Sequence, residues 1–217
     1  MEPEFWHQRW RTGQIGFHND AIHWALKQHW QDLGVDSNEP VLVPLSGKTL
    51  DMRWLRSQGH PVTGVELDPI AVGDFFTEWG RTPRSVAPLT RHELSGFEAD
   101  GICLWQGDFF AYRNDHPFQA FYDRAALIAL PADMRIRYMQ QLRDCLAPSG
   151  IGLLVTLEYD QKQKDGPPFS VLMEEVSGFC GFRSELLERR DVLDESPKFK
   201  HRGVTSLHET VYRLHVN

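Results

Sequence analysis

The amino-acid sequence predicts an α/β fold in which helices cover both faces of a mostly parallel sheet. The chain has 217 residues, of which 41% are apolar, and this is enough for one core in a single domain. Short apolar runs of strand length alternate with segments of helical periodicity. Strands separated by helices are joined by right-handed crossovers and therefore run parallel.

The first half of the chain contains two predicted strands between helices. Residues 21–33 carry apolar side chains at helical spacing, and Asp20 is positioned to cap this helix. The run Val41–Pro44 is apolar throughout and is followed by turn residues, which is typical of a buried strand. Further along, the pattern predicts a helix at 49–58, a strand at 62–66 and a helix through Ile70, Ala71 and Phe75.

The second half begins with a segment that has no clear period. Arg81–Gly101 is polar with two prolines, and we expect a long loop that can carry a hairpin. After it, the pattern predicts strands at 102–105, 120–122, 151–157, 184–190 and 207–214, and helices at 132–146 and near 172–179. Pro148–Gly150 is expected to close the first of these helices.

Composition and charge argue against several classes of protein. The formal net charge is −7, from 23 basic and 30 acidic residues, so we expect no nucleic-acid partner. The longest apolar run, Ile151–Leu157, is much shorter than a membrane span, and the first residues lack the features of a signal peptide. We therefore expect a cytoplasmic protein with no membrane segment, and a monomer.

The cysteines and a basic cluster are further candidate sites. Cys103, Cys145 and Cys180 show no CxxC spacing, so we expect reduced, mostly buried thiols and neither a metal site nor a disulfide. The cluster Lys198–Arg202 has two interpretations, a solvated loop or a contact for an anionic ligand.

Ligands of doubly wound sheets bind beyond the carboxyl ends of the strands, which directs attention to the turn after the first strand. The sequence Gly47-Lys-Thr resembles the end of a phosphate-binding loop, but the required first glycine is replaced by Leu42, inside the strand. The glycines of a dinucleotide-binding turn are also missing, apart from Gly47. This turn therefore indicates a ligand without phosphates at that place.

Acidic residues follow the next two strands. Glu66 lies 22 residues beyond Pro44, where an acid accepts hydrogen bonds from ribose hydroxyls. Together with the turn, it indicates an adenosine joined to an amino acid, as in S-adenosylmethionine; alternatively, Glu66 caps the following helix. Asp108 and Phe109 follow the third strand and can contact adenine, although a simple turn with core phenylalanines has the same pattern.

Six segments in order resemble the thiopurine S-methyltransferase family, in particular its bacterial members. The similarity extends from about residue 5 to 214 and rests on Trp6–Trp10 with Gly16–His18, Val41–Lys48 with Asp51–Met52, Gly59–His60, Gly64–Leu67, Asp123–Ala126 and Gly166–Phe169. Two positions depart from the family pattern: Ser46 replaces a usual cysteine, and Asp68 replaces a frequent serine at a position that caps a helix either way.

The resemblance implies a Rossmann-like class I fold for a methyltransferase that uses S-adenosylmethionine, with a seven-stranded sheet and a last antiparallel hairpin. It also implies roles for individual residues. Trp10 is expected to cover the cofactor, Leu45 to offer backbone to its methionine part, and Glu66 to hold its ribose. Asp108 and Phe109 are expected around the adenine, Arg124 beside the cofactor facing the acceptor, and Phe17 against a flat aromatic acceptor.

The chemistry expected is an in-line methyl transfer, for which the protein mainly aligns the reactants. Arg124 can stabilise an incoming thiolate, or it can form a structural ion pair with Asp123. Residues 1–20 are expected to form a lid on a core of residues 21–217, and Gly13 and Gly16 would let this segment bend. Alternatively, the aromatic side chains of residues 1–20 pack against the sheet.

We therefore expect S-methylation of small aromatic or heterocyclic thiols such as thiopurines, with tellurium and selenium oxyanions as further acceptors and no catalytic base assigned. A sensor or adaptor that binds S-adenosylmethionine without turnover is the alternative, because a fold alone does not prove a function. A nicotinamide-dependent oxidoreductase is disfavoured by the missing glycines.

Overall fold

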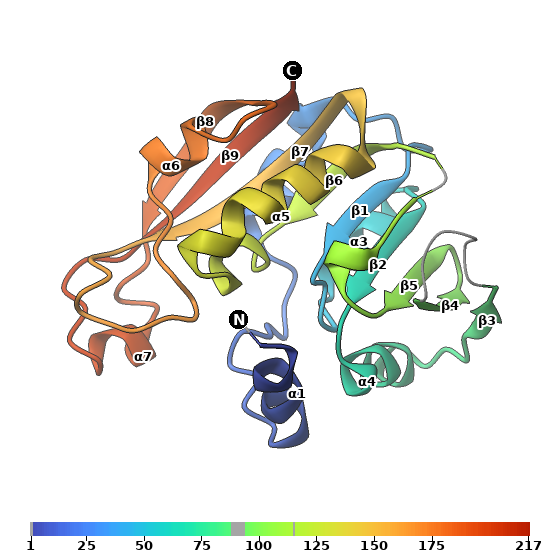
Figure 1. The fold of residues 1–217 in the computed structure, drawn as a ribbon, viewed down its shortest axis with the longest axis horizontal. Helices are drawn as coiled ribbons and strands as arrows, with labels where there is room; N and C mark the ends of the chain where they lie inside the picture. The colour runs from blue at the N-terminus through green and yellow to red at the C-terminus, as the bar shows by residue number, and fades with distance from the viewer. Residues whose placement is uncertain (1, 88–93, 115) are drawn as a thin grey trace.

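The computed structural model describes residues 2–87, 94–114 and 116–217, and these form a layered α/β structure (Figure 1). In the described residues the sheet has nine strands in the order β3-β4-β5-β2-β1-β6-β7-β9-β8. The central strands β5, β2, β1, β6 and β7 are parallel to their neighbours within that group, whereas both flanks of the sheet are antiparallel. The strands are β1 Val41–Pro44, β2 Val62–Glu66, β3 Arg84–Val86, β4 Ser95–Ala99, β5 Ile102–Gln106, β6 Phe118–Asp123, β7 Leu146–Glu158, β8 Phe182–Asp191 and β9 His208–Val216.

The sheet thus has two strands more than the seven expected. Both come from the segment Arg81–Gly101, where a loop able to carry a hairpin was predicted, and residues 88–93 of it lie outside the described residues. β4 pairs antiparallel with β5, and β3 pairs with β4 at the edge. Pairing with a formed edge strand supplies the hydrogen bonds that these short, polar strands need, which explains why periodicity did not reveal them.

Helices and strands alternate along the chain as predicted. The helices are α1 Pro3–Arg11, α2 Trp24–His29, α3 Asp51–Ser57, α4 Pro69–Trp79, α5 Ala132–Cys145, α6 Met173–Ser177 and α7 Pro197–Lys200, with 3-10 turns η1 Gln31–Leu33, η2 Phe109–Ala111 and η3 Leu127–Ala129. α1 was not predicted as a helix, although Pro3 at its start and Glu4 in its first turn are typical helix-initiating features.

Two predicted helix ends are wrong. The first core helix begins at Trp24, and its cap is His23, whose side chain accepts a hydrogen bond from the Ala25 N–H, so Asp20 does not cap it. α5 ends at Cys145 and leads directly into β7, so Pro148–Gly150 belongs to a strand. The register of β7 against β6 shifts near this point, which accommodates the proline without a ladder hydrogen bond.

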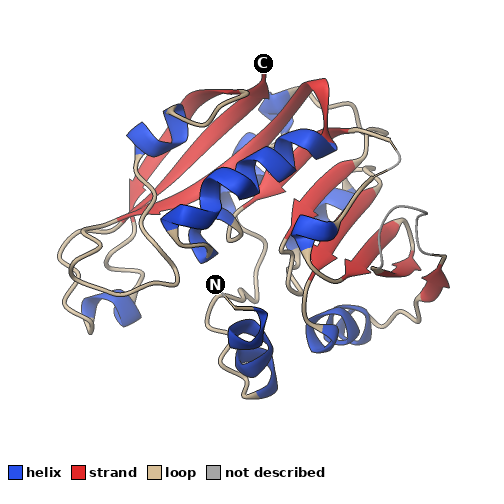
Figure 2. Cartoon of the chain, viewed as in Figure 1, coloured by secondary structure: helices blue, strands red, loops and turns tan. Residues whose placement is uncertain are grey.

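Helices cover both faces of the sheet (Figure 2) because the side chains of each strand alternate. In β1, Leu42 belongs to a core cluster with Tyr138 and Leu142 of α5 on one face. Val41 and Val43 belong to a second cluster on the other face, which contains residues of α2, α3 and α4.

In the part of the chain that the structure describes, no helix is long and apolar enough to cross a membrane. Of the three thiols, Cys145 is buried, Cys103 is half-buried, and Cys180 is exposed, contrary to expectation.

Candidate active site

A cavity of about 1910 Å³ lies at the carboxyl ends of the parallel strands. The loops that follow β1, β2, β5 and β6 line it, together with the N-terminal segment and the segments near residues 163–168 and 192–202. The structure brings every predicted site residue to this one cavity, namely Trp10, Phe17, Leu45, Glu66, Asp108, Phe109 and Arg124. Figure 1 shows α1 beyond the sheet edge, between α4 and α7.

The turn after β1, residues 45–49, lines the cavity. Leu45 has a φ of 46° and Gly47 a φ of 54°, so both adopt the left-handed conformation. For Leu45 this conformation costs roughly 1–2 kcal/mol, and the hydrogen bond from the Ser46 N–H to the Val65 oxygen (3.0 Å) helps to hold it. Two left-handed positions separated by one residue make this turn narrow.

Glu66 is the buried acid of the cavity, with 6% of its surface exposed. One carboxylate oxygen accepts the Gly47 N–H at 2.7 Å and the other accepts the Asp68 N–H at 2.8 Å. Burial raises the pKa of Glu66 to about 7, against the opposing effect of these hydrogen bonds. Asp68, and not Glu66, caps α4 by accepting the Ile70 N–H, so the capping interpretation of Glu66 is wrong.

Asp108 and Phe109 lie at the end of β5. Asp108 caps the η2 turn, since its side chain accepts the Phe110 N–H at 2.9 Å. Phe109 is only 3% exposed and packs on Tyr138 at a ring distance of 5.5 Å, so it is mainly a core residue with an edge on the cavity. Phe110 also lines the cavity, and the Arg137 guanidinium lies 4.2 Å from the centre of its ring. In the sequence analysis, Phe109 was assigned to the site, but Phe110 was not.

Aromatic side chains of the N-terminal segment form one wall of the cavity. Trp10 is buried, and Trp6 and Phe17 are half-buried. The Phe17 ring makes edge contacts with both tryptophans, at ring distances of 5.7 Å to Trp6 and 5.6 Å to Trp10. Gly13, at a φ of 66°, allows the chain to turn back after α1 and bring Phe17 under it.

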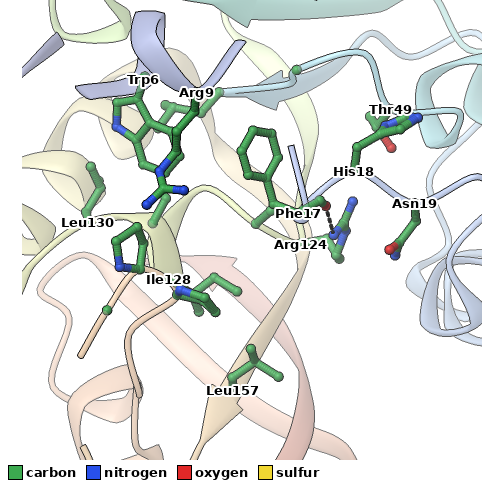
Figure 3. Close-up of a pocket in the computed structure, with 18 of the residues that line it drawn as sticks. Trp6, Arg9, Phe17, His18, Asn19, Thr49, Arg124, Ile128, Leu130 and Leu157 are labelled. Atoms are coloured by element: carbon green, nitrogen blue, oxygen red, sulfur yellow. Dashed lines mark hydrogen bonds between the residues drawn. The ribbon is translucent and has the colours of Figure 1, made fainter. Parts of the chain in front are cut away.

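Arg124 connects this segment to the sheet (Figure 3). Its Nη1 atom donates to the main-chain oxygen of Phe17 at 3.0 Å. Both Arg124 and Asp123 are described, and they form no ion pair; the Asp123 carboxylate accepts instead from the Ala126 and Leu127 N–H groups and from the Tyr138 hydroxyl. Burial raises the pKa of Asp123 to about 6. The Arg124 Nε atom has no hydrogen-bond partner among the described residues.

The far end of the cavity is walled by a proline-rich loop and a cluster of cations. Gly166–Pro168, part of one of the six segments that carry the family resemblance, line it. Lys198 and Arg202 line it too, joined by Arg9 from α1 and Lys164 from the loop after β7. Burial, and then the charges of Arg202 and Arg9, lower the pKa of Lys164. No described carboxylate forms an ion pair with these four side chains.

Arg9, Lys164 and His18 also line the cavity, although no role was assigned to any of them in the sequence analysis. Arg9 and Lys164 are separated by more than half of the chain and meet only in the folded protein. His18 lines the other end, near Arg124 and Thr49 in Figure 3. Burial, and next the charge of Lys48, lower the pKa of His18, so that its imidazole is neutral at pH 7.

Comparison with known proteins gives consistent results. The model of the family described as thiopurine S-methyltransferase matches residues 1–217. Proteins named thiopurine S-methyltransferase from Pseudomonas entomophila (strain L48) and Pseudomonas aeruginosa (strain UCBPP-PA14) are each 49% identical over 218 and 221 residues, which is 99% of this chain and 99% of theirs.

Solved structures similar to this fold include methyltransferases of low sequence identity. The Burkholderia thailandensis 1,6-didemethyltoxoflavin-N1-methyltransferase, bound to its substrate and S-adenosylhomocysteine, has a TM-score of 0.65 at 16% identity, covering 99% of this chain and 87% of that one. A methyltransferase from Thiobacillus denitrificans in complex with S-adenosylhomocysteine has a TM-score of 0.64 at 17% identity, covering 97% and 98%.

Proposed function

Because this chain belongs to the thiopurine S-methyltransferase family and is therefore an S-adenosylmethionine-dependent methyltransferase, we propose that it methylates the sulfur of small aromatic or heterocyclic thiols, thiopurines among them. One observation carries the proposal. The cavity that contains the buried acid Glu66 also contains an aromatic wall with Phe17 at its centre and an arginine, Arg124, whose hydrogen bond to the Phe17 oxygen uses Nη1 and leaves Nη2 for a ligand.

The residues fit the cofactor. Glu66 is fixed by two main-chain N–H groups, and its remaining lone pairs can accept the two ribose hydroxyls. The Leu45 turn offers peptide groups to the amino-acid part, and Trp10 lies against the same turn. Asp108, Phe109 and Phe110 line the place for the adenine. When bound, S-adenosylmethionine would supply an electrophilic methyl group on a sulfonium sulfur, which leaves as the neutral thioether of S-adenosylhomocysteine.

The chain's own part in the reaction is to orient the acceptor and exclude water. Phe17 offers a flat apolar face for an aromatic ring, and the tryptophans beside it offer π faces to a cation. Arg124 can donate to a thiolate from its unused nitrogens, and this favours the ionised, nucleophilic form of the acceptor. No side chain is needed as a base for an acceptor that is already ionised.

The cationic end of the cavity supports acceptors that carry negative charge. Arg9, Lys164, Lys198 and Arg202 line that end and outnumber its two acidic residues, Asp165 and Glu195, in a protein whose net charge is −7. A thiolate, or a tellurium or selenium oxyanion, is attracted into such a site. This observation favours the anionic-ligand interpretation of the Lys198–Arg202 cluster and makes oxyanion methylation the second candidate activity.

We further propose a monomeric, cytoplasmic enzyme. The three cysteines are free thiols, as is usual in a reducing compartment. Light scattering on the purified protein checks the first point, because a mass near 25.1 kDa identifies the monomer.

The test is a calorimetric titration with S-adenosylhomocysteine, followed by methylation assays with 6-mercaptopurine, thiophenol, tellurite and selenite. Binding and turnover of both thiols support the proposal. Binding with turnover of the oxyanions alone transfers the assignment to the second candidate. Binding without any turnover supports a sensor, and absence of binding refutes the assignment of the cavity to the cofactor.

A further inference from the structure

The helix α1 contacts both of the residues that hold the Glu66 carboxylate. His7 Nδ1 lies 2.7 Å from Asp68 Oδ2. One turn further along α1, the Trp10 indole lies against Gly47, where an added β-carbon would be 3.5 Å from Trp10 Cζ2. The N–H groups of Asp68 and Gly47 are the two that donate to Glu66. α1 therefore packs on both sides of the buried acid.

Asp68 uses its two carboxylate oxygens for separate purposes. Oδ1 accepts the Ile70 N–H at 2.8 Å and so caps α4. Oδ2 faces His7, and because an ionised carboxylate can only accept, the hydrogen of this bond is on His7 Nδ1. The cap alone would need a single oxygen, as a serine provides. The second oxygen links the N-terminal helix to the loop after β2.

The burial of this link makes it more than a surface contact. The Asp68 side chain is 2% exposed and the His7 side chain is 29% exposed. Asp68 lies beside a second buried acid, Glu66, and its charge helps to raise the Glu66 pKa, after burial. Lys48 is engaged with Asp74 and Glu78, and Arg11 of α1 is paired with Glu4. Among the described side chains, His7 is therefore the one that forms a hydrogen bond with the Asp68 carboxylate.

We propose that His7 is a positioning residue for the cofactor: by binding Asp68 it docks α1 over the two loops and fixes Glu66 in the orientation that accepts the ribose hydroxyls. Docking of α1 and binding of the cofactor then favour each other, because a coupling between two events is reciprocal. The inference concerns the cofactor alone, so it does not depend on which acceptor is methylated.

The experiment measures S-adenosylhomocysteine binding by calorimetry to His7→Ala, His7→Asn, Asp68→Ser and the double variant His7→Ala/Asp68→Ser. His7→Ala and Asp68→Ser are each expected to weaken binding about tenfold, the lower end of the range for one lost hydrogen bond to a charged group. His7→Asn should recover most of the loss, since its amide can replace Nδ1. The double variant should bind no more weakly than either single variant.

A matched control and a readout without cofactor complete the test. Gln8 is exposed on the same helix, and Gln8→Ala should leave affinity unchanged. In the cofactor-free protein, His7→Ala should speed proteolytic cleavage within residues 12–18, and Gln8→Ala should not. Equal affinity of His7→Ala and wild type would overturn the proposal, as would additive losses in the double variant. A wild type that fails to bind would instead refute the cofactor assignment.

Discussion

Arg124 donates a hydrogen bond of 3.0 Å to the main-chain oxygen of Phe17, which lies 107 residues earlier in the chain. This bond ties the N-terminal segment to the carboxyl end of β6, and it orients the ring of the proposed acceptor wall relative to the arginine. Because the guanidinium is a planar fork of donors, one nitrogen can hold the segment while the others face a ligand.

Replacing Arg124 with Ala should lower kcat/KM for an aromatic thiol about tenfold to a hundredfold, because one charged donor contributes about 1.5–3 kcal/mol. Arg124→Lys should recover only part of the activity, since lysine retains the charge without the fork. Steady-state kinetics with 6-mercaptopurine measure the effect. A melting temperature that collapses in parallel would show that the residue is structural rather than functional.

Replacing Phe17 with Ala should weaken the enzyme mainly by raising KM for aromatic acceptors. The ring is proposed to stack on the acceptor, and a lost aromatic contact is worth about 0.5–1.5 kcal/mol beyond its buried area. Phe17→Leu, which keeps apolar bulk, is the matched control for packing against Trp6 and Trp10. If both variants lose activity only through kcat, stacking on the acceptor is not the role of Phe17.

Folding stability should depend on pH through Glu66. Its pKa is about 7 in the folded chain, against about 4.3 when unfolded. Between these values the folded state holds the additional proton, so its contribution is complete below the unfolded pKa and is lost as the pH rises through 7, by up to about 3 kcal/mol. Urea unfolding at pH 5 and pH 8 measures the difference.

Glu66→Gln is the control for this pH dependence. It removes the titrating group, so the difference between pH 5 and pH 8 should shrink, although Asp123, with a pKa of about 6, contributes in the same direction. S-adenosylhomocysteine affinity of the wild type should increase from pH 6 to pH 8, because ribose hydroxyls donate to an ionised carboxylate. A stability difference that persists unchanged in Glu66→Gln would contradict the assignment.

Removing one cation from the far end of the cavity should affect anionic acceptors selectively. For the anionic thiol para-mercaptobenzoate, Lys164→Gln should raise the Michaelis constant about threefold to tenfold. The variant removes the attraction between the Lys164 ammonium and the acceptor carboxylate, and such an attraction contributes more binding free energy in a buried site than at an exposed surface. For the neutral analogue para-mercaptobenzamide, the constant should stay unchanged. Lys162→Gln is the matched control, because Lys162 is exposed and does not line the cavity. Equal effects on both compounds would indicate a change of shape instead of charge.

Local sequence determined much of the fold and the strand-end positions of the proposed cofactor residues. The α/β class was confirmed, because Val41–Pro44 and Val62–Glu66 are short apolar runs between helical segments. The ends of parallel strands meet at one sheet edge, so the position of Glu66 in the cavity followed from its place in the chain. The missing glycines around Gly47 predict a turn without a phosphate cradle, and in the structure Leu45 and Gly47 of this turn have positive φ angles.

Tertiary structure alone decided the rest. The hairpin of β3 and β4 depends on pairing with β5, and the cation cluster depends on Arg9 and Lys164 meeting across the cavity. His7 and Asp68 show the same limit, since Asp68 was expected to cap a helix but its second oxygen binds a residue 61 positions away. Periodicity and capping are local properties that a sequence displays directly, whereas contacts between distant side chains exist only once packing has fixed their distance and removed the water between them.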